Sequence, residues 1–239
     1  MRLAEKLNVA DKDKTFFESA IAWIELHKNK HCENKIQWGV PKEQRTETFA
    51  SGRTVDKRSF DEVQAYYKGL DFIAKPGFKL SEDCIKELHK IVVEHTPGRC
   101  YPGKYKPYNH IIAFAPKTDK NDVKKEYSNL ISWTNNEIKK GTIHPLLIAG
   151  LFFYEHLNIH PFADGNGRTG RILFVYLLLN TGYEFVRYAS FEKTLQLFKL
   201  QYFKALIEDQ KGVVNKNDVV CKFQVFLFFV LVEMIKRIK

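Results

Sequence analysis

The chain has 239 residues, enough for one large domain or two small ones, and its 44% hydrophobic residues, with 19 Phe and 11 Tyr, can fill a sizeable core. The net charge of +10 admits acidic partners or nucleic acid, but the lysines are scattered as on solvated helix faces, which disfavours a nucleic-acid-binding protein. The four cysteines show no CxxC pairing, which argues against a zinc site or a disulfide framework and indicates reduced thiols.

Helices are expected along the first hundred residues. Apolar residues recur near a 3.6 period over 14–28. Ser59 followed by Glu62 has the pattern of a capping box that opens a helix to about residue 70. Ser81 opens another helix to about residue 95, which a Thr-Pro-Gly sequence then stops.

The segment 102–116 holds aromatic and β-branched residues between prolines and predicts a short hairpin. A helix over 121–140 is expected to end at Gly141. Four more helices are expected, at 144–158, 168–181, 191–211 and 217–237. The predicted fold class is therefore all-α, a helical bundle with one small β-hairpin, in one compact unit with an N-terminal helical extension.

Neither end of the chain predicts a membrane segment. The first residues lack the apolar run of a signal peptide. The apolar run 225–232 is too short to span a bilayer and is flanked by Lys222 and Glu233. We expect a soluble cytoplasmic protein with a buried C-terminal helix; export as an effector stays open.

The most informative stretch, residues 160–171, lies between two apolar helices, with Arg168 expected to open the second. A helix N-terminus carries unpaired N–H groups and partial positive charge. Gly165 and Gly167 let the backbone approach an anion, and Asn166 can add an amide donor. Arg168 and Arg171 are three apart, so both can reach one polyphosphate. The stretch therefore predicts a phosphate-binding site.

Two further residues of this stretch suit catalysis. Asp164 is a hard oxygen ligand for a Mg²⁺ that bridges phosphates, and His160 can take a proton from an incoming hydroxyl. A lone His-Pro or Gly-Asn-Gly sequence is more often a simple turn. A turn between apolar helices has no structural need for an Asp, an Asn and two Arg within eight residues.

These twelve residues resemble the signature of the Fic family, His-x-Phe-x-(Asp/Glu)-Gly-Asn-Gly-Arg-x-x-Arg, at every fixed position. The likeness extends over residues 80–212, and more loosely over the N-terminal helices. It implies the Fic fold, with residues 1–78 as the extension and 79–239 as the core. It also implies transfer of AMP from ATP to a Ser, Thr or Tyr hydroxyl of a target protein, with release of pyrophosphate.

The resemblance assigns roles along the stretch. His160 would be the general base, Asp164 the Mg²⁺ ligand, and Arg168 and Arg171 the residues that hold the phosphates. Gly165, Asn166 and Gly167 would form the anion hole. A helix containing Tyr202 and Phe203 would contribute to the adenine pocket. Asn109, His110 and Ile111 would belong to a β-hairpin "flap" that clamps the target segment by β-augmentation.

The chain departs from the family in its N-terminal region. Many relatives carry an inhibitory helix, (Ser/Thr)-x-x-x-Glu-(Gly/Asn), whose Glu pairs with the second signature arginine. Here Thr46 fits the first position, but Ala50 stands where the Glu would be and Ser51 replaces the Gly or Asn. On this alignment Arg171 is expected to be free for the γ-phosphate.

Other functions of the same fold remain open. Relatives transfer UMP, phosphate or phosphocholine, or remove AMP from modified proteins. A non-catalytic nucleotide-binding regulatory module is the alternative from a different class. Self-modification and a homodimer are also left open.

Overall fold

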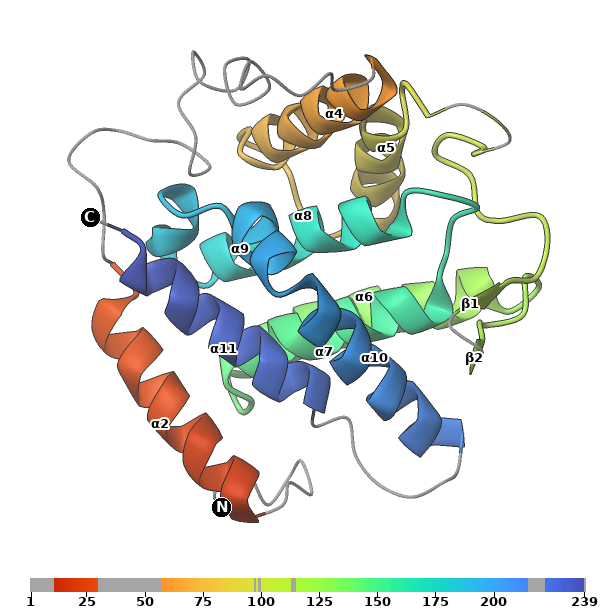
Figure 1. Ribbon diagram of the computed structural model, residues 1–239. Coiled ribbons are helices and arrows are strands. Elements are labelled where there is room, and N and C mark those ends of the chain that lie inside the picture. The colour runs from red at the N-terminus through yellow and green to blue at the C-terminus, as the bar shows by residue number, and fades with distance from the viewer. Residues whose placement is uncertain are drawn as a thin grey trace.

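The structure, a computed structural model, describes residues 11–29, 57–96, 98, 100–112, 115–214 and 222–238. Its regular secondary structure within these ranges is helical apart from one two-stranded hairpin (Figure 1). This confirms the expected fold class. The α-helices are α2 (Asp11–His27), α4 (Lys57–Ile73), α5 (Glu82–Val92), α6 (Val123–Lys140), α7 (Pro145–Ile159), α8 (Asn166–Asn180), α9 (Phe191–Leu197), α10 (Lys199–Val214) and α11 (Lys222–Lys236), with a 3₁₀ helix η1 at Glu184–Arg187.

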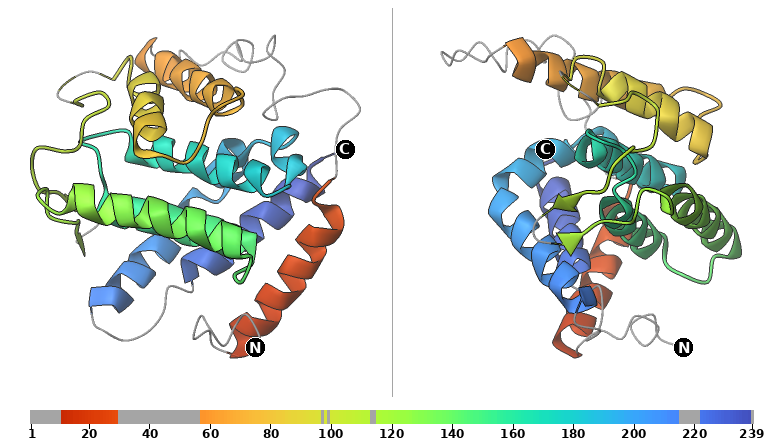
Figure 2. Two further views of the ribbon diagram at one scale, coloured as in Figure 1. Left: turned by 180° about the vertical axis from the view of Figure 1, so that it is seen from behind. Right: turned by 90° about the vertical axis from the view of Figure 1, so that its right-hand side faces the viewer.

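Helices α7 and α8 form the centre of the bundle. Helix α6 packs on α7, while α4 and α5 pack on α8, and α11 contacts α2, α9 and α10. Figure 2 shows α4 and α5 as a layer over α8. Helix α7 and the part of α8 after Arg171 are largely apolar, as buried helices are, and residues such as Phe152, Phe153 and Phe174 are fully enclosed. This packing fixes the short loop between α7 and α8 in place.

Several helix ends follow the sequence signals. The Ser81 hydroxyl accepts a hydrogen bond from the Cys84 N–H at the start of α5. Gly141 ends α6 in the left-handed conformation, with φ 62°. Ser190 caps α9 by accepting from the Lys193 N–H.

Three boundary predictions are wrong. Ser59 lies inside α4, so the capping box does not open that helix. Helix α8 begins at Asn166 rather than Arg168. The helix expected over 191–211 is two helices that meet at Phe198, a residue with φ −117° and ψ 29°. The sequence has no Gly or Pro at this break. The break follows instead from tertiary packing, in which α9 contacts α8 and α10 contacts α11.

The predicted hairpin is confirmed but short. Strand β1 (Ile111–Ile112) pairs antiparallel with β2 (Ala115–Pro116), with Ile111 opposite Pro116. The Lys117 N–H continues the ladder by donating to the His110 carbonyl over 3.0 Å. None of the described helices is long and apolar enough to cross a membrane.

Candidate active site

The loop between α7 and α8 borders a pocket of about 550 Å³. The pocket gathers residues from the loop, from the start of α8, from the hairpin and from α4. Its lining consists of Glu62, His110, His160, Ala163, Asp164, Gly165, Asn166, Gly167, Arg168 and Arg171. The structure thus brings together the predicted base, metal ligand, anion hole and both arginines.

The N-terminus of α8 opens into this pocket without a side-chain cap. The N–H groups of its first residues have no acceptor within the helix, so they remain available to an anion. Gly165 precedes them with φ 77°, and a Cβ there would lie 2.5 Å from the Val93 Cγ1 atom. Glycine is therefore required at this position for both conformation and space.

The Asn166 side chain closes the loop through two hydrogen bonds to Phe162. The side chain is buried, with Oδ1 accepting from the Phe162 N–H over 2.9 Å and Nδ2 donating to the Phe162 carbonyl over 2.8 Å. Both ends of that amide thus help to close the loop, and a role for its remaining N–H as a donor to the anion stays a prediction. Asn166 faces the pocket through its backbone.

Two buried histidines hold carbonyls of the same loop. His89 Nδ1 accepts from the Gly103 N–H, so His89 Nε2 carries the proton and donates to the Asp164 carbonyl over 2.9 Å. His156 Nε2 lies 3.0 Å from the Asn166 carbonyl and donates to it, while Nδ1 accepts from the Tyr127 hydroxyl over 2.7 Å. Burial lowers the pKa of each imidazole to about 4. Both rings are therefore neutral, and they hold the carbonyls of Asp164 and Asn166 at the start of α8.

His160 ends α7 in a left-handed conformation, with φ 52° and ψ 62°. Its ring centroid lies 5.3 Å from that of His110 in the hairpin segment. Burial, with His110, His156, Lys117 and Lys106 nearby, lowers the pKa of His160 to about 3. The imidazole is thus neutral, the form that accepts a proton.

The first arginine of α8 faces several groups. Arg168 donates to the Val92 carbonyl over 3.3 Å and to the Thr96 hydroxyl over 3.1 Å, which fixes it against the end of α5. Its guanidinium is also 3.8 Å from the Asp164 Oδ1 atom and 3.9 Å from the Glu62 Oε2 atom. Arg168 is therefore held at the pocket wall rather than mobile in solvent.

Arg171 has an acidic partner that the sequence did not predict. Its Nε forms an ion pair with the Glu192 carboxylate, at the start of α9. Burial alone would lower the pKa of Arg171, but the Glu192 carboxylate raises it above the usual value. Because an added Cβ on Gly167 would lie 3.1 Å from Arg171 NH1, that end of the guanidinium faces the loop. Glu192 thus takes one edge of the guanidinium and leaves another edge toward the pocket.

Asp164 can bind a metal ion only when other oxygen atoms, such as those of a bound nucleotide, complete the coordination. Its side chain is 54% exposed, and Oδ1 accepts from the Gly165 N–H. No group of three or more His, Cys, Asp or Glu side chains within the described ranges could hold a metal ion. A single carboxylate fits Mg²⁺ that takes its remaining oxygens from phosphates and water.

The flap residues divide into three roles. Asn109 pins the hairpin base, since Nδ2 donates to the Asp119 carboxylate over 2.7 Å and Oδ1 accepts from the Lys120 N–H over 2.7 Å. His110 lines the pocket. Ile111 is 78% exposed, which leaves its side chain available to a partner.

Tyr202 and Phe203 lie outside the described lining of this pocket. Tyr202 is buried next to the Arg171–Glu192 pair and packs edge-on against Phe223, whereas Phe203 is 45% exposed. Their assignment to an adenine pocket stays a prediction. Thr46, Ala50 and Ser51 lie outside the described residues, so the inhibitory segment also stays a prediction.

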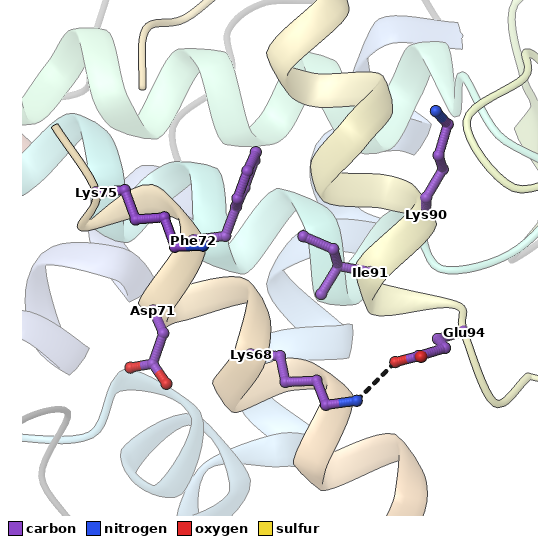
Figure 3. Close-up of a pocket in the computed structure, with 7 residues that line it drawn as sticks. All are labelled: Lys68, Asp71, Phe72, Lys75, Lys90, Ile91 and Glu94. Atoms are coloured by element: carbon purple, nitrogen blue, oxygen red, sulfur yellow. Dashed lines mark hydrogen bonds and ion pairs between the residues drawn. The ribbon is translucent and has the colours of Figure 1, made fainter. Parts of the chain in front are cut away.

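A second pocket, of about 570 Å³, lies between α4 and α5 (Figure 3). Lys68 and Glu94 join across it at 2.7 Å, and Lys75 lies over the Phe72 ring at 5.9 Å from its centroid. Lys90 pairs with Glu87 at 2.7 Å. This groove has the volume of the first pocket but no uncapped helix end and no neutral imidazole in its lining. The two pockets have similar volumes, so the candidate active site is assigned to the pocket at α8 by the chemistry of its lining residues.

Sequence reasoning missed four residues that shape the site: His89, His156, Lys106 and Glu192. Each is distant in sequence from most of what it contacts, and none forms a local pattern. A buried polar residue inside an apolar helix, as at His156, is the one signal that could have drawn attention.

Comparison with known proteins points to one family. Residues 79–178 match the family model described as Fic/DOC family. The protein adenylyltransferase Fic of Drosophila melanogaster is 49% identical over 137 residues, and that of Drosophila yakuba is 33% identical over 137 residues. Each alignment covers 54% of this chain and 27% of the relative, so the chain spans about a quarter of these relatives' length.

Solved structures share the fold over nearly the whole chain. A Fic family protein from Desulfovibrio desulfuricans G20 matches with a TM-score of 0.65 at 21% identity, covering 99% of this chain and 68% of that chain. Fic-1 from C. elegans matches with a TM-score of 0.67 at 19% identity, covering 95% of this chain and 70% of that chain. IbpAFic2, seen covalently tethered to Cdc42, matches with a TM-score of 0.58 at 21% identity, covering 94% of this chain and 70% of that chain.

Proposed function

Because the chain carries a Fic/DOC family domain at residues 79–178, we propose that it is a protein adenylyltransferase. The substrate is ATP with Mg²⁺, the acceptor is a Ser, Thr or Tyr hydroxyl of a target protein, and pyrophosphate leaves. One observation carries the proposal: the uncapped N-terminus of α8 and a neutral His160 border the same pocket. An anion site and a proton acceptor at one pocket suit attack of a hydroxyl on a phosphate.

The residues divide the reaction between them. The N–H groups at the start of α8, with Arg168 and Arg171, would bind the phosphates and offset charge that builds up during transfer. Asp164 would hold Mg²⁺, which supplies further positive charge against the phosphate oxygens. His160 would accept the proton of the attacking hydroxyl. The proton acceptor and the phosphate-binding groups line one pocket, which would bring the attacking hydroxyl and the phosphates together.

The hairpin would present the target. An exposed strand edge can pair with an extended segment of another protein through main-chain hydrogen bonds. Ile111 is exposed beside His110, which reaches the pocket, so a segment paired with β1 would carry its hydroxyl toward His160. IbpAFic2 tethered to Cdc42 supports a protein as the kind of acceptor.

Asp164→Ala should abolish the Mg²⁺ dependence of ATP binding. One carboxylate alone is a poor site for Mg²⁺, so metal and nucleotide should bind together. Calorimetry of the parent should show no Mg²⁺ binding without nucleotide and tighter ATP binding with the metal. Tight Mg²⁺ binding to the protein alone, or unchanged metal dependence in Asp164→Ala, would be inconsistent with this role.

Nucleotide should raise the pKa of His160. In the free protein, burial and nearby cationic groups hold that pKa at about 3, so the ring should stay neutral at pH 5.5. Phosphates in the pocket add negative charge, which favours the protonated ring and moves the pKa toward neutrality, where a general base works best. An NMR titration of the His160 ring with and without a non-hydrolysable ATP analogue measures this. No upward shift on binding would place the phosphates elsewhere.

A further inference from the structure

Lys106, in the segment before the hairpin, contacts the turn that carries His160 at two points. Its backbone N–H donates to the Pro161 carbonyl over 2.9 Å. Its Nζ donates to the Ile159 carbonyl over 3.2 Å. One residue therefore binds the carbonyls that immediately precede and follow the proposed base.

His160 needs such support because of its backbone conformation. A positive φ is unfavourable for a residue with a Cβ, and it persists where surrounding contacts over-determine it. The His160 N–H donates to the His156 carbonyl over 3.0 Å, so α7 fixes how the chain enters this residue. The Lys106 backbone N–H fixes the direction of the chain after His160, through its hydrogen bond to the Pro161 carbonyl.

The burial of Lys106 favours a specific purpose. The residue is 3% exposed, whereas lysine is seldom fully buried without a partner. Its ammonium lies at the C-terminal end of α7, where carbonyls have no helical donor and cations are stabilised. A surface lysine that supplied only solubility would not carry its charge into this position.

We propose that Lys106 is a positioning residue that sets the direction of the His160 imidazole and links the hairpin segment to the base. The inference rests on the proposed transfer function. Lys106 is not among the residues that line the pocket, so it would act through the turn. Loss of its side chain removes the hydrogen bond to the Ile159 carbonyl and keeps the backbone bond to Pro161. We therefore expect it to misdirect His160 while leaving the phosphate site at α8 intact.

The test compares three variants. Lys106→Met removes the ammonium donor but keeps an apolar stem of similar size. Lys106→Arg keeps a charged donor. Lys117→Met is the control for loss of a buried charge. Lys117 follows the hairpin, is buried and also lowers the pKa of His160, but within the described residues its Nζ makes no hydrogen bond to the turn.

Lys106→Met should lower kcat for transfer about 10- to 100-fold, because misplacement of a reacting group by about 1 Å costs that order of rate. Its KM for ATP should stay within about twofold, since ground-state binding is untouched. Lys106→Arg should recover most of the kcat. Lys117→Met, which removes a nearby charge but no hydrogen bond to the turn, should lose clearly less kcat than Lys106→Met. The Cα and Cβ chemical shifts of His160 should move away from left-handed values in Lys106→Met alone.

Three results would overturn the inference. They are a parental kcat in Lys106→Met, an equal loss in Lys117→Met, or a fall in kcat matched by falls in ATP binding and thermal midpoint that Lys106→Arg does not rescue. If the parent itself transfers nothing from ATP, the proposed function fails, and the His160 chemical shifts decide on Lys106 independently. Unchanged shifts in Lys106→Met would then reject its positioning role.

Discussion

His160→Ala is expected to lower kcat for AMP transfer by about 10²–10⁴-fold while leaving ATP binding close to that of the parent, because loss of a general base typically costs that much. The imidazole acts on the incoming hydroxyl and not on the nucleotide. ATP should be bound mainly by the start of α8. There His89 and His156 hold the carbonyls of Asp164 and Asn166 by hydrogen bonds. The His160 ring can be removed without breaking these contacts.

The matched control is His27→Ala, which removes an imidazole on α2 that stacks on Trp23 at 4.2 Å between centroids. Initial rates and ATP affinity should be measured for the parent and both variants. The control should keep the parental rate. Full activity in His160→Ala would remove this residue from the mechanism, and lost ATP affinity in the same variant would show that it binds nucleotide instead.

Glu192→Gln is expected to lower the free energy of unfolding by about 3 kcal/mol, the lower end for breaking a buried ion pair, because the pair is partly exposed. The change leaves the charge of the half-buried Arg171 without its anionic partner. Arg171→Met with Glu192→Gln should lose less than the sum of the two single changes, since the double variant leaves no unpaired charge. Urea unfolding of all four proteins measures this coupling.

ATP provides an independent check on the same pair. In Glu192→Gln the phosphates would supply the negative charge that Arg171 has lost, so ATP with Mg²⁺ should raise the thermal midpoint more than it does in the parent. Glu192→Gln that is as stable as the parent would mean that the ion pair contributes little. An ATP-induced shift no larger than in the parent would mean that Arg171 does not reach the phosphates.

The sequence predicted those parts of the site that depend on neighbours along the chain. Residues 160–165 join α7 to α8, so a short loop had to place His160 and Asp164 near the start of α8. Turn and cap chemistry likewise placed Ser81 and Gly141, since each acts within a few residues of itself.

The parts that escaped prediction depend on packing between distant segments. Glu192 reaches Arg171 because α9 packs on α8. Lys106 reaches Ile159 across 53 positions of sequence. The Asn166 amide has four hydrogen-bonding options, and only the folded loop shows that Phe162 takes two of them. The break at Phe198 has no local signal, because tertiary contacts override helix propensity there.

The most direct test of AMP transfer uses ATP labelled at either the α- or the γ-phosphate, incubated with Mg²⁺, the parent chain and a cell lysate, with His160→Ala in parallel. AMP transfer predicts protein bands labelled from α-labelled ATP alone, absent with His160→Ala, and a mass gain of one AMP on the modified protein. Label from γ-labelled ATP alone would mean phosphate transfer, and protein that gains no label from either nucleotide would contradict transfer from ATP altogether.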